Sequence, residues 1–150
     1  MGPTARALYL RFRLVIGIVL FVALAMQFVP YGWDHSNPPV VDPVRWPSAE
    51  AERVARASCY DCHSNETEWP IYSYVAPMSW LVRHDVDEGR SALNFSEWDD
   101  FDSEADDAAE EIITGSMPPA EYVRLHPDAS LNQVEKRLLI DALAEIDERD

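Results

Sequence analysis

The most apolar part of the chain lies at its N-terminus. Residues 14–29 read LVIGIVLFVALAMQFV and contain no charged side chain. Arg6, Arg11 and Arg13 precede this run, and Pro30 ends it. The run is slightly shorter than the ~17 residues that a membrane-spanning helix needs, but the charged ends of the flanking arginines can reach the lipid headgroups. The pattern therefore predicts one N-terminal transmembrane helix.

A cleaved secretory signal is the alternative for this segment, because Ala23-Leu24-Ala25 resembles a cleavage site behind a basic start. The apolar run continues past that site through Phe28 and Val29, which favours an uncleaved anchor. With either interpretation the arginines stay on the cytoplasmic side by the positive-inside rule. We expect residues 1–30 to be a single-pass anchor in the cytoplasmic membrane, with the rest of the chain on its outer side.

Proline marks the next segment, since five prolines fall within residues 30–47. Because proline fixes φ and removes a backbone donor, residues 31–47 are predicted to form an extended spacer. The remaining residues, 48–150, are long enough for one small domain.

Helical periodicity, rather than strand alternation, runs through this domain. A first helix is predicted to begin after Ser48 as its N-cap and to run to about Cys62. A second covers residues 78–90, with Pro77 at its first turn and Gly89 near its end.

Two further helices follow. The third begins at Ser103 and is stopped by Gly115, and its apolar residues at helical spacing are Ala105, Ala108, Ala109, Ile112 and Ile113. Residues 130–133, which read SLNQ, are predicted to form a capping box for the last helix. That helix carries an apolar stripe of Leu131, Val134, Leu138, Ala142, Leu143 and Ile146. The expected fold class is all-α, a small helical domain with long loops behind one transmembrane helix.

The net charge is strongly acidic, −15 at pH 7. Residues 31–150 hold all 27 acidic side chains but only 9 of the 12 basic ones. Such a surface repels phosphate backbones, which excludes nucleic acid as a partner. It suits a basic protein partner or simple solubility.

The only two cysteines are Cys59 and Cys62, and His63 follows them. C-x-x-C-H is the pattern of c-type haem attachment. Because residues three and four apart share a helix face, both thiols and the imidazole can face the same bound group. Two thioether bonds would hold the porphyrin, and the imidazole would reach the iron while its other ring nitrogen donates to a backbone carbonyl. The motif predicts one haem c per chain in a cytochrome c-like domain.

Other chemistries also use a C-x-x-C pair. Zinc needs further ligands at matching spacing, and no second C-x-x-C and no H-x-x-x-H occurs. A thioredoxin-like pair needs a βαβ context, which the helical pattern lacks. A structural disulfide between Cys59 and Cys62, in a haem-free thiol protein, stays open as an alternative.

Met117 is the favoured sixth ligand of the iron. It lies in the sequence GSMPP just before the last helix, where prolines restrict the loop. Methionine opposite histidine is the ligand pair of cytochromes c. His84, His126 and Met78 are the competitors, and an ordinary packing role for Met117 also stays open.

Other residues are candidates for the surroundings of the haem. Arg83 and Arg90 are candidates to pair with the propionates, with surface ion pairs as the alternative. His35 lies in the spacer and is expected in solvent. Aromatic side chains that can wall the pocket are Trp69, Tyr72, Tyr74, Trp80, Phe95 and Trp98.

The sequence resembles the bacterial haem-binding domain family of membrane-anchored, c-type cytochrome-like proteins. The resemblance implies that Cys59, Cys62 and His63 bind haem and that Met117 is the distal ligand, in a domain on the periplasmic side of the membrane. It covers nearly the whole chain: the N-terminal anchor, Asn37-Pro38-Pro39, residues 59–67 (CYDCHSNET), Trp69-Pro70, Tyr72-Ser73-Tyr74, Pro77, Ser79-Trp80, residues 93–98 (LNFSEW), Met117-Pro118-Pro119 and Leu125-His126-Pro127.

Together these features predict single-electron transfer at the outer face of the membrane, with a redox partner of basic charge. A haem-based sensor or ligand-binding domain, and an accessory subunit of a membrane respiratory complex, are the alternatives. The sequence contains no recognisable catalytic constellation, so an enzyme is not expected.

Overall fold

The computed structural model describes residues 3–98 and 104–148 of the chain. Over these residues the structure is helical, with seven α-helices and, in place of strands, one isolated parallel bridge between Asp42 and Glu97. The predicted all-α class is confirmed. The predicted helix start at Ser103 lies outside the described residues.

The chain divides into two compact units. The first unit consists of Met1–His35 and Pro70–Arg83, and the second consists of Ser36–Trp69 and His84–Asp150. Helix α4 (Met78–Ala92) contributes its residues 78–83 to the first unit and 84–92 to the second.

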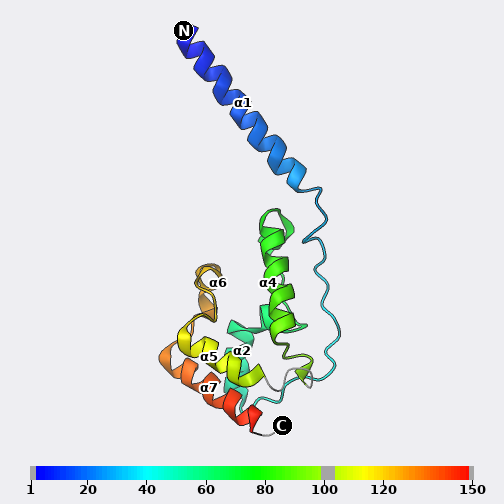
Figure 1. Cartoon of the computed structure of the whole chain (residues 1–150), viewed down its shortest axis with the longest axis vertical. Helices are drawn as coiled ribbons and strands as arrows, with labels where there is room; N and C mark the ends of the chain where they lie inside the picture. Colours follow the sequence, from blue (N-terminus) through cyan, green and yellow to red (C-terminus); the bar gives the residue numbers. More distant parts are fainter. Residues whose placement is uncertain (1–2, 99–103, 149–150) are drawn as a thin grey trace. The chain divides into compact units, whose positions relative to one another are not determined.

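The first unit contains α1 (Pro3–Met26), a single uninterrupted helix (Figure 1). Its residues Arg6–Met26 are long and apolar enough to cross a membrane, and none of them is buried in the protein. At 1.5 Å per residue these 21 residues extend about 31 Å, which matches the ~30 Å hydrocarbon layer of a bilayer. The predicted N-terminal apolar helix is therefore present.

A short 3-10 helix, η1 (Ile71–Tyr74), belongs to the same unit. His35 lies against it and is half-buried, because its ring stacks on Tyr74 with centroids 4.0 Å apart. The expectation that His35 is solvated is wrong, since the spacer packs on a segment that is distant in the sequence.

The second unit starts with α2 (Ala49–Ser58), which Ser48 caps as predicted by accepting a hydrogen bond from the Ala51 amide. A short helix α3 (Tyr60–His63) follows directly. Helix α5 (Ala105–Thr114) ends at Gly115, whose φ of 80° is the left-handed conformation that glycine adopts readily. The sequence pattern did not reveal α6 (Ala120–Leu125) or the 3-10 turn η4 (Pro127–Ala129).

The last helix, α7 (Gln133–Asp147), begins two residues later than predicted. Its N-cap is Asn132, whose side chain accepts from two amides while the Glu135 carboxylate accepts from the Asn132 amide. Ser130 instead ends the preceding turn, so the SLNQ capping box is wrong. The predicted stripe is confirmed at Ala142, Leu143 and Ile146, which are buried, but Val134 is exposed and the unpredicted Leu139 is in the core.

Helices α5 and α7 lie side by side, and α2 packs against α7 (Figure 1). Ile113, which was expected on the inner face of α5, is exposed. Between these helices lies a core of Val54, Ala55, Ala109, Ile112, Leu139, Leu143 and Ile146, extended by the aromatic rings of Tyr60, Phe95 and Trp98.

Candidate functional site

The C-x-x-C-H segment sits at a break between two helices. One helix was predicted to run through it, but α2 ends before Cys59 and α3 begins after it, because Cys59 takes φ −128° and ψ −37°, outside the α-helical region. The His63 amide still donates to the Cys59 carbonyl at 2.9 Å. Cys59 and His63 therefore stay one turn apart although the helix is interrupted at Cys59.

The segment 93–95, thirty residues further along the chain, holds His63 on two sides. His63 Nδ1 lies 3.2 Å from the Leu93 carbonyl oxygen, and the Phe95 amide donates to the His63 carbonyl at 2.8 Å. Because a carbonyl oxygen only accepts, Nδ1 carries the proton and Nε2 keeps its lone pair. This contact confirms the predicted hydrogen bond from the imidazole to a backbone carbonyl.

Burial also lowers the pKa of His63, even though the carbonyls of Leu93 and Gly89 act in the opposite direction. A lowered pKa keeps the ring neutral at pH 7. His63 thus has the protonation state that binding to a metal ion requires.

A buried polar network fixes this segment. Asn94 donates to the side chain of Asn65 at 3.0 Å and accepts from the Ser96 amide at 3.0 Å. The hydroxyl of Ser96 accepts in turn from the Asn65 amide at 2.9 Å. These three polar side chains are buried, and their mutual hydrogen bonds offset the cost of that burial. Since Asn94 lies between Leu93 and Phe95, the network fixes the backbone that orients His63.

A cavity of about 410 Å³ lies beside His63, entirely within the second unit. Its volume falls in the range of roughly 300–1,000 Å³ that is usual for small-molecule and cofactor sites. Cys59, His63 and Met117 all line it. Its apolar walls are Trp46, Ala92, Leu93, Phe95, Ala108, Ile112, Pro118, Leu139 and Leu143.

The two thiols are free and occupy different surroundings. Cys59 lines the cavity, whereas Cys62 does not and packs against Gly89 of α4. A Cβ atom at Gly89 would lie 2.5 Å from the carbonyl oxygen of Cys62, so only glycine permits this contact. Gly89, expected near a helix end, is therefore a close-approach residue inside α4.

Burial raises the pKa of both thiols. That of Cys62 reaches about 12, because the negative charges of Asp85 and Asp61 add to the effect of burial. Both groups are thus neutral thiols at pH 7. Among residues 3–98 and 104–148, no group of three or more His, Cys, Asp or Glu side chains is placed to hold a metal ion.

Of the four candidates for the sixth ligand, Met117 lines the cavity and the other three do not. His84 is exposed and pairs with Glu88. His126 precedes η4 and stacks on Tyr122 with ring centroids 4.3 Å apart. Met78 opens α4 in the first unit. The cavity therefore brings together His63 and Met117.

Six aromatic residues were predicted to wall the haem pocket. Of these six, Phe95 lines the cavity and the other five do not. Its ring packs against those of Trp46, Tyr60 and Trp98 at 5.2–5.9 Å. Trp46, which also lines the cavity, was missed because it lies in the proline-rich segment that was interpreted as a spacer.

The two arginines proposed for propionates have other partners. Arg83 pairs with Asp34 at 3.3 Å. Arg90 donates to the Ser64 carbonyl and to the side chains of Asn37 and Thr67, and so fixes the loop after the C-x-x-C-H motif. Neither residue lines the cavity.

Asp61, inside the C-x-x-C-H motif, was not recognised as important from the sequence. Its Oδ1 accepts from the Glu68 amide at 2.9 Å, and its Oδ2 accepts from the Tyr122 hydroxyl at 2.7 Å. Tyr122 belongs to α6, which directly follows the Met117-Pro118-Pro119 sequence. The motif and the segment that carries Met117 are thus tied together by one side-chain contact.

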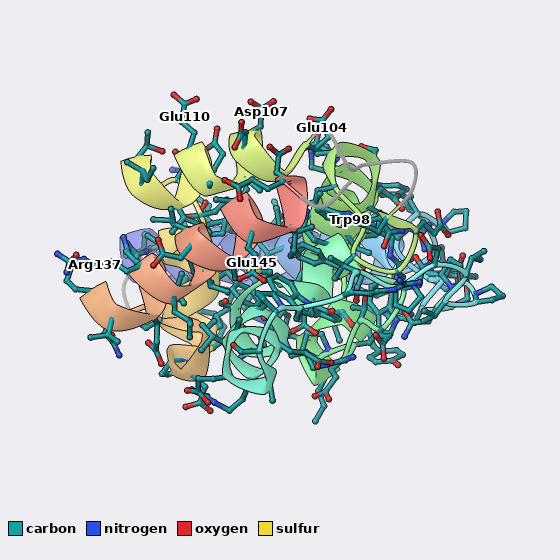
Figure 2. The ribbon with its side chains drawn as sticks, turned by 90° about the horizontal axis from the view of Figure 1, so that it is seen from below. Trp98, Glu104, Asp107, Glu110, Arg137 and Glu145 are labelled. Carbon is teal, nitrogen blue, oxygen red and sulfur yellow. The ribbon has the colours of Figure 1, made fainter. Side chains whose placement is uncertain are left out.

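Three carboxylates line the cavity, and we call them the acidic rim: Glu104, the N-cap of α5, and Asp107 and Glu111 within α5. Figure 2 shows Glu104, Asp107 and Glu110 projecting from the same side of this helix. Asp107, Glu110 and Glu111 are exposed. Part of the negative charge found in the composition therefore lies beside the cavity.

Comparison with known proteins gives the family. The model of the haem-binding domain family matches residues 21–145, a span that includes the C-x-x-C-H motif and Met117. The chain belongs to this haem-binding domain family. No curated protein and no solved structure matches the chain. The resemblance noted from the sequence is confirmed at this level, and haem is the cofactor of the domain.

The cavity of the haem-binding domain fits this cofactor in three respects. It is lined mostly by apolar side chains, as a porphyrin requires. Its His63 presents an unprotonated nitrogen, and a thioether and a thiol line the same space. Cys62 is the one predicted haem-binding residue that the structure places outside this lining.

Proposed function

We propose that the chain is a c-type cytochrome that transfers single electrons at the outer face of the cytoplasmic membrane. The observation that carries this proposal is that Cys59, His63 and Met117 line one apolar cavity. The haem would supply an iron that accepts and releases one electron. The chain's own residues supply attachment, axial ligands and exclusion of water.

Covalent attachment is assigned to Cys59 and Cys62. Each thiol would add across one vinyl group of the porphyrin, so that a carbon–sulfur bond forms and the thiol hydrogen passes to the neighbouring vinyl carbon. No oxidant is needed for this addition. Both groups are neutral thiols in the folded chain, and the raised pKa of Cys62 disfavours its thiolate. Attachment is therefore expected to occur before the domain closes around the motif.

His63 and Met117 are the side chains that would bind the iron. The Leu93 carbonyl holds the proton of the imidazole on Nδ1, which leaves Nε2 for the iron. Phe95, Leu139 and the other apolar wall residues keep water away from the site. If the surrounding residues held both side chains on the iron, the site would change little between oxidation states, which would favour electron transfer over ligand activation.

The acidic rim suits a basic redox partner. Complementary charge at the mouth of a cofactor site mainly raises the rate of encounter, and this effect weakens with salt. The membrane location is supported by the length of α1 and by the three arginines before its apolar run.

The proposal is tested by producing the full chain together with haem-attachment machinery. A haem stain that survives denaturing electrophoresis is expected, and it should be lost when both Cys59 and Cys62 are replaced by alanine. The oxidised protein should show the methionine-to-iron charge-transfer band. This band should vanish in Met117→Ala and persist in the matched variant Met78→Ala. A haem-free product from wild-type chain would overturn the proposal.

A haem-based ligand sensor is the second candidate. It is favoured by the exposure of Met117, whose side chain is 36 % accessible and so can be displaced by an external ligand. A sensor predicts that the reduced wild-type protein binds carbon monoxide as readily as Met117→Ala does. A carrier predicts binding only after Met117 is removed.

A further inference from the structure

The loop before α4 is attached to the end of α1. Gln27 follows the last residue of α1, and its side chain makes two hydrogen bonds with the backbone of Ala76. Its Nε2 donates to the Ala76 carbonyl at 3.0 Å, and its Oε1 accepts from the Ala76 amide at 3.0 Å. A paired contact of this kind fixes both the position and the direction of the loop, residues 70–77.

Two more contacts make the loop and the segment after α1 one body. His35 Nδ1 donates to the Trp33 carbonyl at 2.9 Å, and its Nε2 lies 3.0 Å from both the carbonyl oxygen and the hydroxyl of Ser73. Gly32, at φ 84°, packs so closely on the Ser79 carbonyl that a Cβ atom would lie 2.5 Å from its oxygen. The loop therefore stays next to the helix end.

The side chains that this body exposes are apolar or aromatic. Ile71 is 89 % accessible, and Tyr74 and Val75 are exposed beside it. Phe28 and Trp33, which come shortly after α1, are exposed as well. Residues 70–78 contain no charged side chain, although the chain beyond residue 30 is strongly acidic. A water-facing loop of this protein would be expected to carry carboxylates.

We propose that residues 70–77 form a second membrane contact, in which Ile71, Tyr74 and Val75 enter the boundary between lipid headgroups and acyl chains. The occupant of this surface is the bilayer, because the loop is fixed at the end of a helix with the length of a membrane span. Tyrosine and tryptophan are the residues that favour this boundary. The aliphatic side chains add apolar area that water otherwise covers.

This contact would hold the first unit at the membrane surface in two places, at the end of α1 and at residues 70–77. The inference rests on the proposed transmembrane role of α1, and its test must therefore report on α1 separately.

The test uses the full chain in phosphatidylcholine–phosphatidylglycerol nanodiscs. A keto amino acid that couples to a nitroxide label replaces one residue at a time, so that both native cysteines stay in place. Ile71 and Val75 are the test positions, Val19 in α1 is the bilayer reference, and Val134, which is exposed on α7, is the water reference. The measurement compares collision rates of the label with oxygen and with a water-soluble nickel complex.

We expect the oxygen-to-nickel ratio at positions 71 and 75 to exceed that at 134 several-fold, and to lie below that at 19. A ratio at 71 and 75 equal to that at 134 would overturn the inference while position 19 still reports lipid. Low collision rates with both reagents would mean that a protein surface covers the loop, which also overturns it. A water-like ratio at 19 would overturn the transmembrane anchor together with this contact.

Discussion

The hydroxyl of Tyr122 donates a hydrogen bond to the carboxylate of Asp61 over 2.7 Å. Asp61 lies between the two cysteines, and Tyr122 lies shortly after Met117 in the chain. This single contact joins the segment that attaches haem to the segment that supplies its proposed sixth ligand. Its loss should therefore loosen Met117 without touching the cofactor.

Replacing Tyr122 by phenylalanine tests this link. The ring can still stack on His126, so the variant removes only the hydrogen bond. We expect a loss of about 1.5–3 kcal/mol in the free energy of unfolding, as for a hydrogen bond to a charged group. We also expect the methionine-to-iron band to disappear at a lower pH during alkaline titration. Tyr31→Phe, at an exposed position in the first unit, is the control and should change neither.

Gly89→Ala should destabilise the domain, although alanine ordinarily stabilises a helix interior by about 1 kcal/mol relative to glycine. The new methyl group would meet the backbone of Cys62 at 2.5 Å, and backbone cannot move aside cheaply. Thermal unfolding measures the effect. Gly17→Ala has open space around it and serves as the control. A melting temperature of Gly89→Ala at or above that of the wild type would contradict the close approach.

Phe95→Ala should cost about 3–5 kcal/mol, the usual range for removing a buried aromatic ring. Phe95 is 3 % accessible and contacts Trp46, Tyr60, Trp98 and the ring of His63. Urea unfolding of the haem-free chain measures this cost without a contribution from the cofactor. Phe28→Ala removes an exposed ring and should leave the urea midpoint unchanged.

Acid should destabilise the haem-free chain partly through His63. The pKa of His63 is lower in the folded chain than its value near 6.5 in the unfolded chain, so the unfolded chain takes up this proton first. Stability from this group is fully present above pH ~6.5 and falls as the pH drops below it. Unfolding free energies at pH 5 and 7 should therefore differ less in His63→Gln than in the wild type. His84→Gln, the same substitution at an exposed site, is the control.

Charge reversal at the acidic rim should slow electron exchange with a positive reagent. Asp107→Lys and Glu111→Lys remove negative charge beside the cavity, and we expect the rate with hexaammineruthenium(III) to fall by roughly tenfold or less at low salt. The rate with ferricyanide, an anion, should rise. Asp141→Lys makes the same change in charge on an exposed part of α7 and should have a smaller effect. Equal effects of all three variants would show that only net charge matters.

Sequence patterns correctly predicted the all-α class, the Ser48 cap and the Gly115 stop. These features depend on residues close together in the chain. The cavity wall was predicted poorly, because Trp46 and Phe95 meet only after distant segments pack. The same holds for Gly89, whose role depends on a contact with Cys62, and for Arg90, which binds a loop rather than a propionate.

The last helix, α7, shows within a single element how far local sequence can predict structure. Ser130 and Asn132 are both good N-cap residues, and local sequence does not decide between them. Asn132 is the N-cap because its side chain accepts hydrogen bonds from two backbone amides. The Glu135 carboxylate in turn accepts a hydrogen bond from the Asn132 amide. With this start Val134 lies in the first turn, where it is exposed, whereas Leu139 is buried in the core.

The hydrogen bonds between residues 93–95 and His63 have a consequence for moving the C-x-x-C-H motif into another protein. The five residues of C-x-x-C-H can be copied into another helix with both thiols and the ring. Such a copy would lack the carbonyl of Leu93 and the buried Asn65 and Asn94 that fix its position. A grafted copy should therefore still capture a porphyrin, but its imidazole would rotate freely, and such a graft would give a haem stain with a heterogeneous spectrum.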